Sequence, residues 1–320
     1  MSDTPDPHPF HQWIDAAQPR AQLWRTVVGL LLIAVVWFAW TLGLIFASIG
    51  GGVMDPDAFR VMFGMANSPL SYTQTIAIVL VALATLWGFT IGVWAALKLL
   101  HKRRLSTLVA SDGRFSFSQF GIGCAIAAGY LASSTVWSII SGNPPRRSEL
   151  AIGTWLIALG PIAIVVFVQA ASEELVFRGY LPQQLAARFT SPLVWGLLPS
   201  IVFGFMHAAN SPGNQTYAIY YVVIATVMGM AMLAMVWRTG SLAAAMGFHF
   251  INNLGALTLA GADSGPSSMA LFVSTPDQLM HGASIELLLV GGTLAFVLSP
   301  WAPLPKGQAL VRRNETRAAP

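Results

Sequence analysis

Charged residues are scarce in this chain of 320 residues: Asp, Glu, Lys and Arg make up 9%, whereas hydrophobic residues make up 55%. A typical soluble domain has about 25% charged residues, so the composition argues against a soluble fold. Alternating segments of about ten residues, typical of outer-membrane barrels, are also lacking. Apolar runs of about 20 residues, long enough to cross the hydrocarbon core, recur instead. The composition predicts an all-α polytopic membrane protein.

Cysteine is almost absent, and the single Cys124 excludes an intrachain disulfide. It lies in an apolar run, where we interpret it as a small core residue rather than a nucleophile. The chain also lacks a zinc knuckle, a phosphate-binding glycine loop and a basic surface interleaved with aromatic residues. We therefore expect no nucleic-acid partner, and attribute the net charge of +4 to basic loops that orient the chain in a bilayer.

Eight apolar segments are expected to cross the membrane as helices. They cover about 26–49, 73–100, 117–141, 151–177, 192–210, 217–237, 241–261 and 283–302. The first is too long for a signal peptide, so we expect it to remain as an anchor. The predicted organisation is a cytoplasmic arm at 1–25, helices 1–3 at 26–150, a core of helices 4–7 at 151–261, an outer loop with helix 8 at 262–302, and a cytoplasmic tail at 303–320.

The distribution of basic residues supports an even number of crossings. With both termini in the cytoplasm, 14 of the 17 Lys and Arg residues fall on the cytoplasmic side, and only Arg60, Arg146 and Arg147 fall on the other. An odd number of spans would break this alternation. The sequence thus predicts a multi-pass membrane protein with both termini in the cytoplasm.

Two adjacent glutamates end the fourth span, and ionisable residues at bilayer depth indicate a functional site. Glu174 and Arg178 are four residues apart on one helix face, which predicts an ion pair. Glu173 has Phe177 at that spacing and lacks a local cation. We expect Arg178 to hold Glu174 anionic, leaving Glu173 as a general base. A structural triad that joins helices, or a pair that snorkels to the headgroups, is the alternative.

The fifth span brings a histidine to the same depth. With the intervening turn near Thr190, Glu173 lies 17 residues before it and His207 17 residues after it. Equal distances from the turn of an antiparallel hairpin mean equal depth. Phe203, one turn before His207, is expected to fix the imidazole by packing. A histidine that is merely satisfied within the core is the alternative.

The seventh span carries His249 and Asn253 on one face, where two donors one turn apart suit a developing oxyanion. Interhelical hydrogen bonding is the alternative, and Asn252 is expected to point elsewhere. No serine or cysteine has a nucleophile arrangement, and Ser172 points off the Glu173 face. We therefore expect that water is the nucleophile and hydrolysis the reaction. Glu173 and the histidine of the fifth span are expected to hold this water molecule and deprotonate it.

A metal ion is left open by the residues themselves. Glu173, His207 and His249 are residue types that bind Zn²⁺ and could supply three ligands, with a fourth position for water. They are scattered over three helices, however, and the chain has no His-Glu-x-x-His run. A zinc site and a metal-free glutamate mechanism therefore remain two alternatives.

The three motifs Glu-Glu-x-x-x-Arg, Phe-x-x-x-His and His-x-x-x-Asn, in this order on successive helices, resemble the CPBP family of intramembrane proteases. This family is also called the Abi or CAAX-protease family, and the resemblance covers roughly Ile152 to Ala260. It implies an eight-helix bundle with a conical cavity that opens toward the cytoplasm, where peptide substrates enter.

The resemblance also implies residue roles: Glu173 and His207 activate water, while His249 and Asn253 stabilise the oxyanion. Members of the family have been described both as metalloproteases and as metal-free glutamate proteases. Eukaryotic members remove the C-terminal tripeptide of prenylated CAAX proteins. We therefore expect a peptide or lipidated protein as substrate, a lipid bilayer as partner, and a bacterial inner membrane as location.

Two other functions remain compatible with the sequence. One is a proton-coupled transporter or channel in which Glu173 and Glu174 relay protons, with helices interrupted near Pro161 and Pro199. No inverted repeat is visible to support it. The other is a non-catalytic bacteriocin-immunity or scaffold protein that keeps the motifs for packing.

Overall fold

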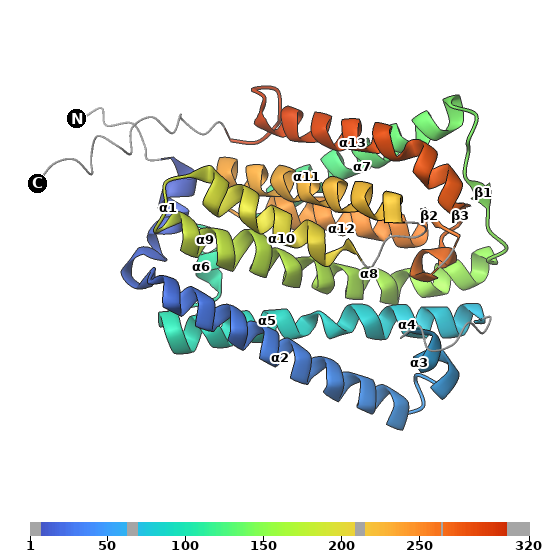
Figure 1. Ribbon diagram of the computed structural model, residues 1–320, viewed down its shortest axis with the longest axis horizontal. Coiled ribbons are helices and arrows are strands. Elements are labelled where there is room, and N and C mark those ends of the chain that lie inside the picture. The colour runs from blue at the N-terminus through green and yellow to red at the C-terminus, as the bar shows by residue number, and fades with distance from the viewer. Residues whose placement is uncertain (1–7, 63–69, 209–214, 264, 306–320) are drawn as a thin grey trace, which may run out of the picture.

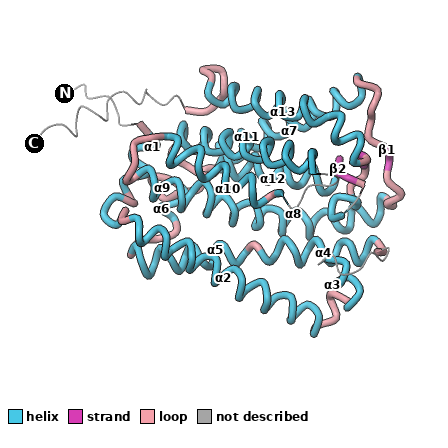
Figure 2. The backbone as a smooth tube through the Cα atoms, viewed as in Figure 1, coloured by secondary structure: helices cyan, strands magenta, loops and turns pink. Residues whose placement is uncertain are grey.

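The computed structural model describes residues 8–62, 70–208, 215–263 and 265–305, which form a bundle of roughly parallel and antiparallel helices (Figures 1 and 2). Most of the predicted tail at 303–320 lies outside the described residues. The α-helices are α1 (Pro9–Asp15), α2 (Leu23–Gly50), α3 (Pro56–Met62), α4 (Tyr72–Thr85), α5 (Trp87–Ala96), α6 (Ser106–Val109), α7 (Phe117–Ile140), α8 (Ile152–Glu174), α9 (Leu181–Ala186), α10 (Leu198–Met206), α11 (Gln215–Thr239), α12 (Ala243–Thr258) and α13 (Pro276–Leu298). Three π-helical turns lie at Leu97–His101, Leu175–Tyr180 and Leu193–Leu197.

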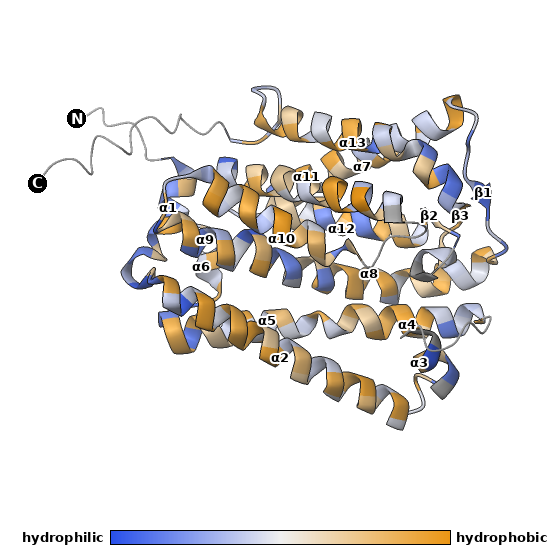
Figure 3. Ribbon diagram, viewed as in Figure 1, coloured by the Kyte–Doolittle hydropathy of each residue, from blue (hydrophilic) through white to orange (hydrophobic). Residues whose placement is uncertain are grey.

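The all-α membrane fold predicted from composition is confirmed. Among the described residues, six helices are long and apolar enough to span a bilayer. They are Leu23–Gly50, Tyr72–His101, Phe117–Ile140, Ile152–Ala186, Thr216–Thr239 and Pro276–Leu298. Figure 3 shows their hydrophobic surfaces, with hydrophilic residues gathered near the ends of the bundle and on α8 and α12.

The predicted count of eight spans is not confirmed. The segments expected to form the fifth and seventh spans are the shorter apolar stretch Leu193–Met206 and the 16-residue helix α12. At about 1.5 Å per residue, 16 residues cover only about 24 Å of a hydrocarbon core about 30 Å thick. Both helices nevertheless run alongside the long spans (Figure 1), so their side chains reach the interior of the bundle.

A small sheet, which the sequence analysis did not predict, closes one end of the bundle. Strands β1 (Arg146–Arg147), β3 (Phe272–Ser274) and β2 (Ala260–Ala262) lie in the order β1-β3-β2. β1 pairs with β3 antiparallel, and β2 pairs with β3 in parallel. The sheet ties the loop before α8 to the chain that follows α12.

Close approach of α7 and α12 fixes the position of α12. A Cβ atom at Gly123 would clash with the backbone oxygen of Ala244, and one at Gly247 would clash with that of Phe120. Small residues that let helix backbones touch are a general device of membrane bundles. The two glycines therefore set α12 against α7, with the next turn of α12 facing α8.

The N-terminal arm, expected to be simply polar, contains the docked helix α1. Phe10, Trp13 and Ile14 are buried, and Trp13 Nε1 donates to the backbone oxygen of Leu108 at 2.8 Å. Gln183 Nε2 on α9 donates to the backbone oxygen of Trp13 at 2.7 Å. The helix thus covers one end of the bundle, the same end at which α13 finishes (Figure 1).

Candidate active site

The glutamate pair lies at the end of α8, inside the bundle. Glu173 is 7% exposed and Glu174 is fully buried. The chain continues from Glu174 into the π-helical turn Leu175–Tyr180 and then into α9, so helical structure runs unbroken from Ile152 to Ala186. π-turns inside helices are frequent at functional sites because they change the direction of neighbouring side chains.

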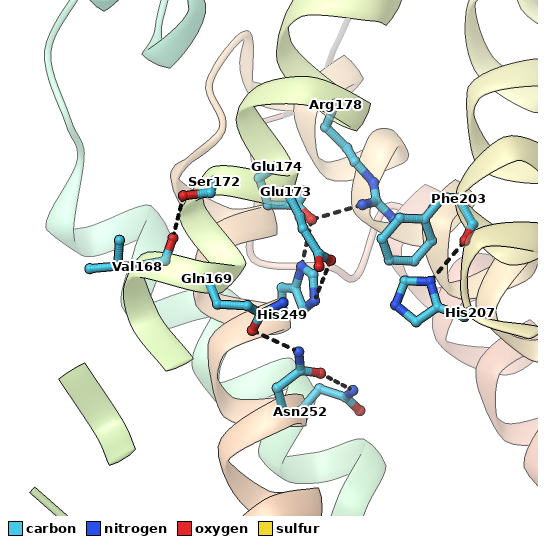
Figure 4. Close-up of polar contacts among 11 residues, drawn as sticks. Val168, Gln169, Ser172, Glu173, Glu174, Arg178, Phe203, His207, His249 and Asn252 are labelled. Atoms are coloured by element: carbon cyan, nitrogen blue, oxygen red, sulfur yellow. Dashed lines mark hydrogen bonds and ion pairs between the residues drawn. The ribbon is translucent and has the colours of Figure 1, made fainter. Parts of the chain in front are cut away.

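The ion pair expected from the four-residue spacing is present. Arg178 Nη1 donates to Glu174 Oε1 at 2.9 Å, and Arg178 is only 1% exposed (Figure 4). The guanidinium carbon also lies 3.9 Å from the ring centre of Phe203, as in a cation–π contact. A Cβ atom at Gly229 of α11 would lie 3.1 Å from Arg178 Nη2, so this glycine makes room for the guanidinium.

His249 of α12 lies between the two carboxylates. Its Nδ1 is 2.7 Å from Glu174 Oε1, and its Nε2 is 3.6 Å from Glu173 Oε2. This arrangement differs from the expectation that only Arg178 would compensate Glu174 and that Glu173 would stand alone. The imidazole comes from a helix distant in sequence, so the spacing of residues on α8 gave no sign of it.

Buried polar atoms without a protein partner cluster at this point. Glu173 Oε2, Glu174 Oε2 and Arg178 Nη2 are buried and have no hydrogen-bond partner among the described residues. Buried polar groups in proteins are almost always paired, with protein or with ordered water. The three atoms therefore mark a position that suits a polar guest such as water or a substrate amide.

His207 follows α10 and faces the same cluster from the other side. Its Nδ1 is 2.8 Å from the backbone oxygen of Phe203, and the two rings are 4.3 Å apart. Because a carbonyl only accepts, Nδ1 must carry a proton, which leaves Nε2 to act as the acceptor. His207 interacts electrostatically with Glu173 and His249, so the structure brings together the groups that the hairpin argument placed at one depth.

Phe203 connects these groups by packing, as its position one turn before His207 predicts. Its ring centre lies 5.4 Å from that of Phe177 and 5.9 Å from that of His249. It is 2% exposed, so it is part of the interior of the bundle. We assign it a positioning role.

Asn253 lies in a chain of amides. Its Nδ2 donates to Gln169 Oε1 at 3.0 Å, and its Oδ1 accepts from Asn252 Nδ2 at 3.1 Å. The expectation that Asn252 points elsewhere was therefore wrong. One amide hydrogen of Asn253 is already used by Gln169, so the pair of free donors expected from His249 and Asn253 is not what the structure contains.

The hydroxyl of Ser172, the residue before Glu173, is engaged elsewhere. Ser172 Oγ donates to the backbone oxygen of Val168 at 2.7 Å and lies 2.8 Å from Thr90 Oγ1, on the side of α8 away from His249 (Figure 4). This agrees with the expected direction of Ser172.

The described residues contain no preformed zinc site. Among the residues that the structure describes, no group of three His, Cys, Asp or Glu side chains is arranged to hold a metal ion. His249 Nδ1 is engaged with Glu174, and its Nε2 lies 3.6 Å from Glu173 Oε2. The mechanism below is therefore derived from the side chains of this chain alone.

Two further ionisable groups within the bundle were not singled out from the sequence. Tyr221 of α11 interacts electrostatically with Glu173. Glu286 of α13 accepts hydrogen bonds from Tyr130 Oη at 2.8 Å and Ser134 Oγ at 3.3 Å. Glu286 could have been found by the same rule that singled out Glu173, because it is an acidic residue within an apolar span.

Residues 154–255 match the family model described as type II CAAX prenyl endopeptidase Rce1-like. The matched range contains the residues of the polar cluster and its neighbours: Glu173, Glu174, Arg178, Phe203, His207, His249 and Asn253. The chain is also similar to the uncharacterized protein YyaK of Bacillus subtilis (strain 168), with 23% identity over 233 residues, or 72% of this chain and 76% of that protein. No solved structure matches the chain significantly. The family match supports an intramembrane endopeptidase as the general class, in a multi-pass membrane protein.

Proposed function

We propose that this protein, through its Rce1-like domain, is an intramembrane endopeptidase that hydrolyses a peptide bond with a water molecule activated by Glu173 and His207. The observation that carries the proposal is the cluster of Glu173, Glu174, Arg178 and His249 inside an apolar bundle, with three unpartnered polar atoms among the described residues. A cluster kept only for packing would gain most from pairing every atom, since an unsatisfied buried polar group costs about 1–3 kcal/mol.

The charge balance of the cluster supports Glu173 as the base. Two carboxylates and one guanidinium leave one negative charge when His249 is neutral, so one added proton makes the cluster neutral. With the proton on His249, Glu173 is a free carboxylate that can accept a proton from water, and the imidazolium stabilises negative charge nearby.

The reaction then proceeds in two steps. Glu173, assisted by His207 Nε2, takes a proton from water while the water oxygen attacks the carbonyl carbon of the substrate. The oxyanion that forms is stabilised by His249, and Asn253 contributes the one amide hydrogen that it does not donate to Gln169. Glu173 next delivers the proton to the leaving nitrogen, the C–N bond breaks, and the carboxylate is restored. Such acid–base catalysis typically contributes about 10²–10⁴-fold in rate.

For the substrate, we propose a peptide or protein that ends in a prenylated CAAX sequence, because the matched domain is of the CAAX prenyl endopeptidase type. We propose that it enters from the cytoplasmic face, in keeping with the 14 basic residues that the charge count assigns to that side. The apolar helices around the cluster would accommodate a lipid-modified chain.

The decisive variant is Glu173→Gln in the purified full-length protein, tested with a fluorogenic farnesylated CAAX peptide and its unprenylated form. We expect hydrolysis to fall by at least about 10²-fold, because the amide cannot accept a proton. The matched control is Glu286→Gln, which makes the same exchange at a partly buried glutamate on α13, bonded to Tyr130, and should keep its activity. If Glu173→Gln hydrolyses the peptide like the wild type, the proposed mechanism is wrong.

The transporter alternative is tested on the same preparations. Proteoliposomes containing the wild type should cleave the peptide without conducting protons. Proton flux that depends on Glu173, in the absence of any peptide cleavage, would favour a relay and contradict the endopeptidase.

A further inference from the structure

A cavity of about 280 Å³ lies at the end of the bundle that α1 covers. It forms where the segment after α1 meets the turn after α5, and its lining includes Ala17, Arg20, His101, Lys102 and Arg103. It is separate from the candidate active site, none of whose residues line it. Three of the five side chains named carry a permanent positive charge.

The backbone beside this cavity has an unusual form. The π-helical turn Leu97–His101 ends α5, and Lys102 follows in the left-handed region with φ of 54°. Lys102 is the only non-glycine residue with positive φ in the described part of the chain. Such conformations cost free energy and are concentrated at functional sites. Here the bend places three successive side chains, from His101 to Arg103, along the cavity.

Arg103 is incompletely bonded at this cavity. Its Nη1 donates to Thr107 Oγ1 at 3.1 Å and to Gln183 Oε1, whereas its Nε and Nη2 are buried without a hydrogen-bond partner among the described residues. Burial lowers the pKa of Arg103 to about 10, which still leaves it charged at neutral pH. A buried guanidinium edge with two unused donors suits an oxyanion, which can accept both hydrogen bonds at once.

The positive charge around the cavity is not balanced by carboxylates. Arg20, Arg25 and Arg103 all interact electrostatically with His101. No ion pair in the described residues involves Arg20, Arg25, Lys102 or Arg103. The acidic residue nearest in sequence to Arg20 is Asp15, which accepts a hydrogen bond from Gln18. An anion from outside the chain is therefore the natural counter-charge.

We propose that this cavity binds a phosphate group, carried by the headgroup of an anionic phospholipid or present as free phosphate. A merely solvated basic surface would explain Lys102, which is exposed, but not the buried, unpaired donors of Arg103. The cavity also lies at the end of the spans, where basic pockets meet lipid headgroups in membrane proteins. The proposal is independent of the proposed peptidase activity.

The test uses full-length protein in a neutral detergent and follows the midpoint of thermal unfolding. The protein is titrated with mixed micelles containing phosphatidylglycerol, with phosphatidylcholine micelles, and with sodium phosphate against sodium chloride at equal ionic strength. The pocket variant is Arg20→Gln/Lys102→Gly, in which glycine suits the left-handed backbone. The control is Arg104→Gln/Arg114→Gln, which removes the same charge from exposed residues that do not line the cavity.

Phosphatidylglycerol should raise the unfolding midpoint of the wild type, and the pocket variant should need about 30-fold more lipid, because each basic side chain near an anionic surface contributes roughly fivefold. The control should respond within about twofold of the wild type, since its charges lie outside the cavity. Stabilisation by sodium phosphate with no preference for phosphatidylglycerol would support the site but assign it to free phosphate.

An equal response of the pocket variant and the control, or no response to either phosphate source, would overturn the proposal. Lys102→Gly alone serves if the double variant does not fold, because it removes one cation while relieving the left-handed residue. Its expected effect is about fivefold, and an unchanged lipid dependence would again refute the site.

Discussion

Removing the positive charge of Arg178 tests whether the buried cluster acts as one unit. Arg178→Met keeps most of the side-chain volume but leaves Glu174 fully buried, with His249 as its remaining partner. Breaking a buried ion pair by removing one member typically costs about 3–5 kcal/mol. The cation–π contact with Phe203 is lost as well, which adds about 1–2 kcal/mol. We therefore expect a loss of roughly 4–7 kcal/mol.

The measurement is thermal unfolding in detergent at a fixed scan rate, for the wild type, Arg178→Met, Glu174→Gln and the double variant. At about 2–4 °C per kcal/mol, Arg178→Met should unfold at least about 8 °C below the wild type. The double variant has no isolated charge left at this pair, and the amide oxygen introduced by Glu174→Gln could still accept a hydrogen bond from His249. It should be more stable than either single variant.

Additive losses in this double-mutant cycle would refute the reasoning, because groups that compensate each other must show a coupling energy. A coupling of at least about 2 kcal/mol is expected for a pair buried to this degree. Peptide hydrolysis by Arg178→Met should fall together with stability, since His249 and Glu173 lose their fixed geometry. A stable and fully active Arg178→Met would show that the ion pair does not organise the site.

Two further predictions concern packing and pH. Gly123→Ala should destabilise the protein by about 1–3 kcal/mol, because its Cβ would clash with the backbone oxygen of Ala244. The control Gly121→Ala should not destabilise it, because no atom lies within 4 Å of the added Cβ. Equal unfolding midpoints of the two variants would contradict the α7–α12 contact. Burial, with a smaller contribution from His11, lowers the pKa of His8 from its usual 6.5 to about 4, so its unfolded form binds more protons between these values. The contribution of neutral His8 to stability should be fully present above pH 6.5 and should fall toward pH 4 by up to about 1.4 kcal/mol per pH unit. The unfolding midpoint of His8→Gln should vary less over that pH range than that of the wild type. An identical pH dependence of the two proteins would refute the assignment.

Local spacing predicted the parts of the site that lie on one helix. The contact of Glu174 with Arg178 follows from four-residue spacing, and so does the packing of Phe203 against His207. The position of His249 could not be obtained in this way. It depends on the rotation of α12 about its axis, and α12 is surrounded by other helices, so its apolar residues do not mark a single buried face.

The docked N-terminal helix was missed for a different reason. Phe10, Trp13 and Ile14 have the i, i+3, i+4 spacing of an amphipathic helix, which is the signal that could have revealed it. The polar residues around them dominated the interpretation of the arm. The short sheet was missed because its strands have only two or three residues each, too few for an alternating pattern.

The choice between the two glutamates is supported by the structure for a reason that spacing did not provide. Glu173 does not lack a basic neighbour, because His249 Nε2 lies 3.6 Å away. What separates the two residues is access: Oε1 of Glu174 already accepts from Arg178 and lies 2.7 Å from His249 Nδ1, and the side chain is fully buried. Glu173 keeps 7% of its surface exposed. Its Oε2 has no hydrogen bond among the described residues, so a water molecule can bind there without displacing a protein partner. Because a base must both reach and release a proton, the less confined carboxylate is the better candidate, and Glu174 is the one that holds the cluster in place.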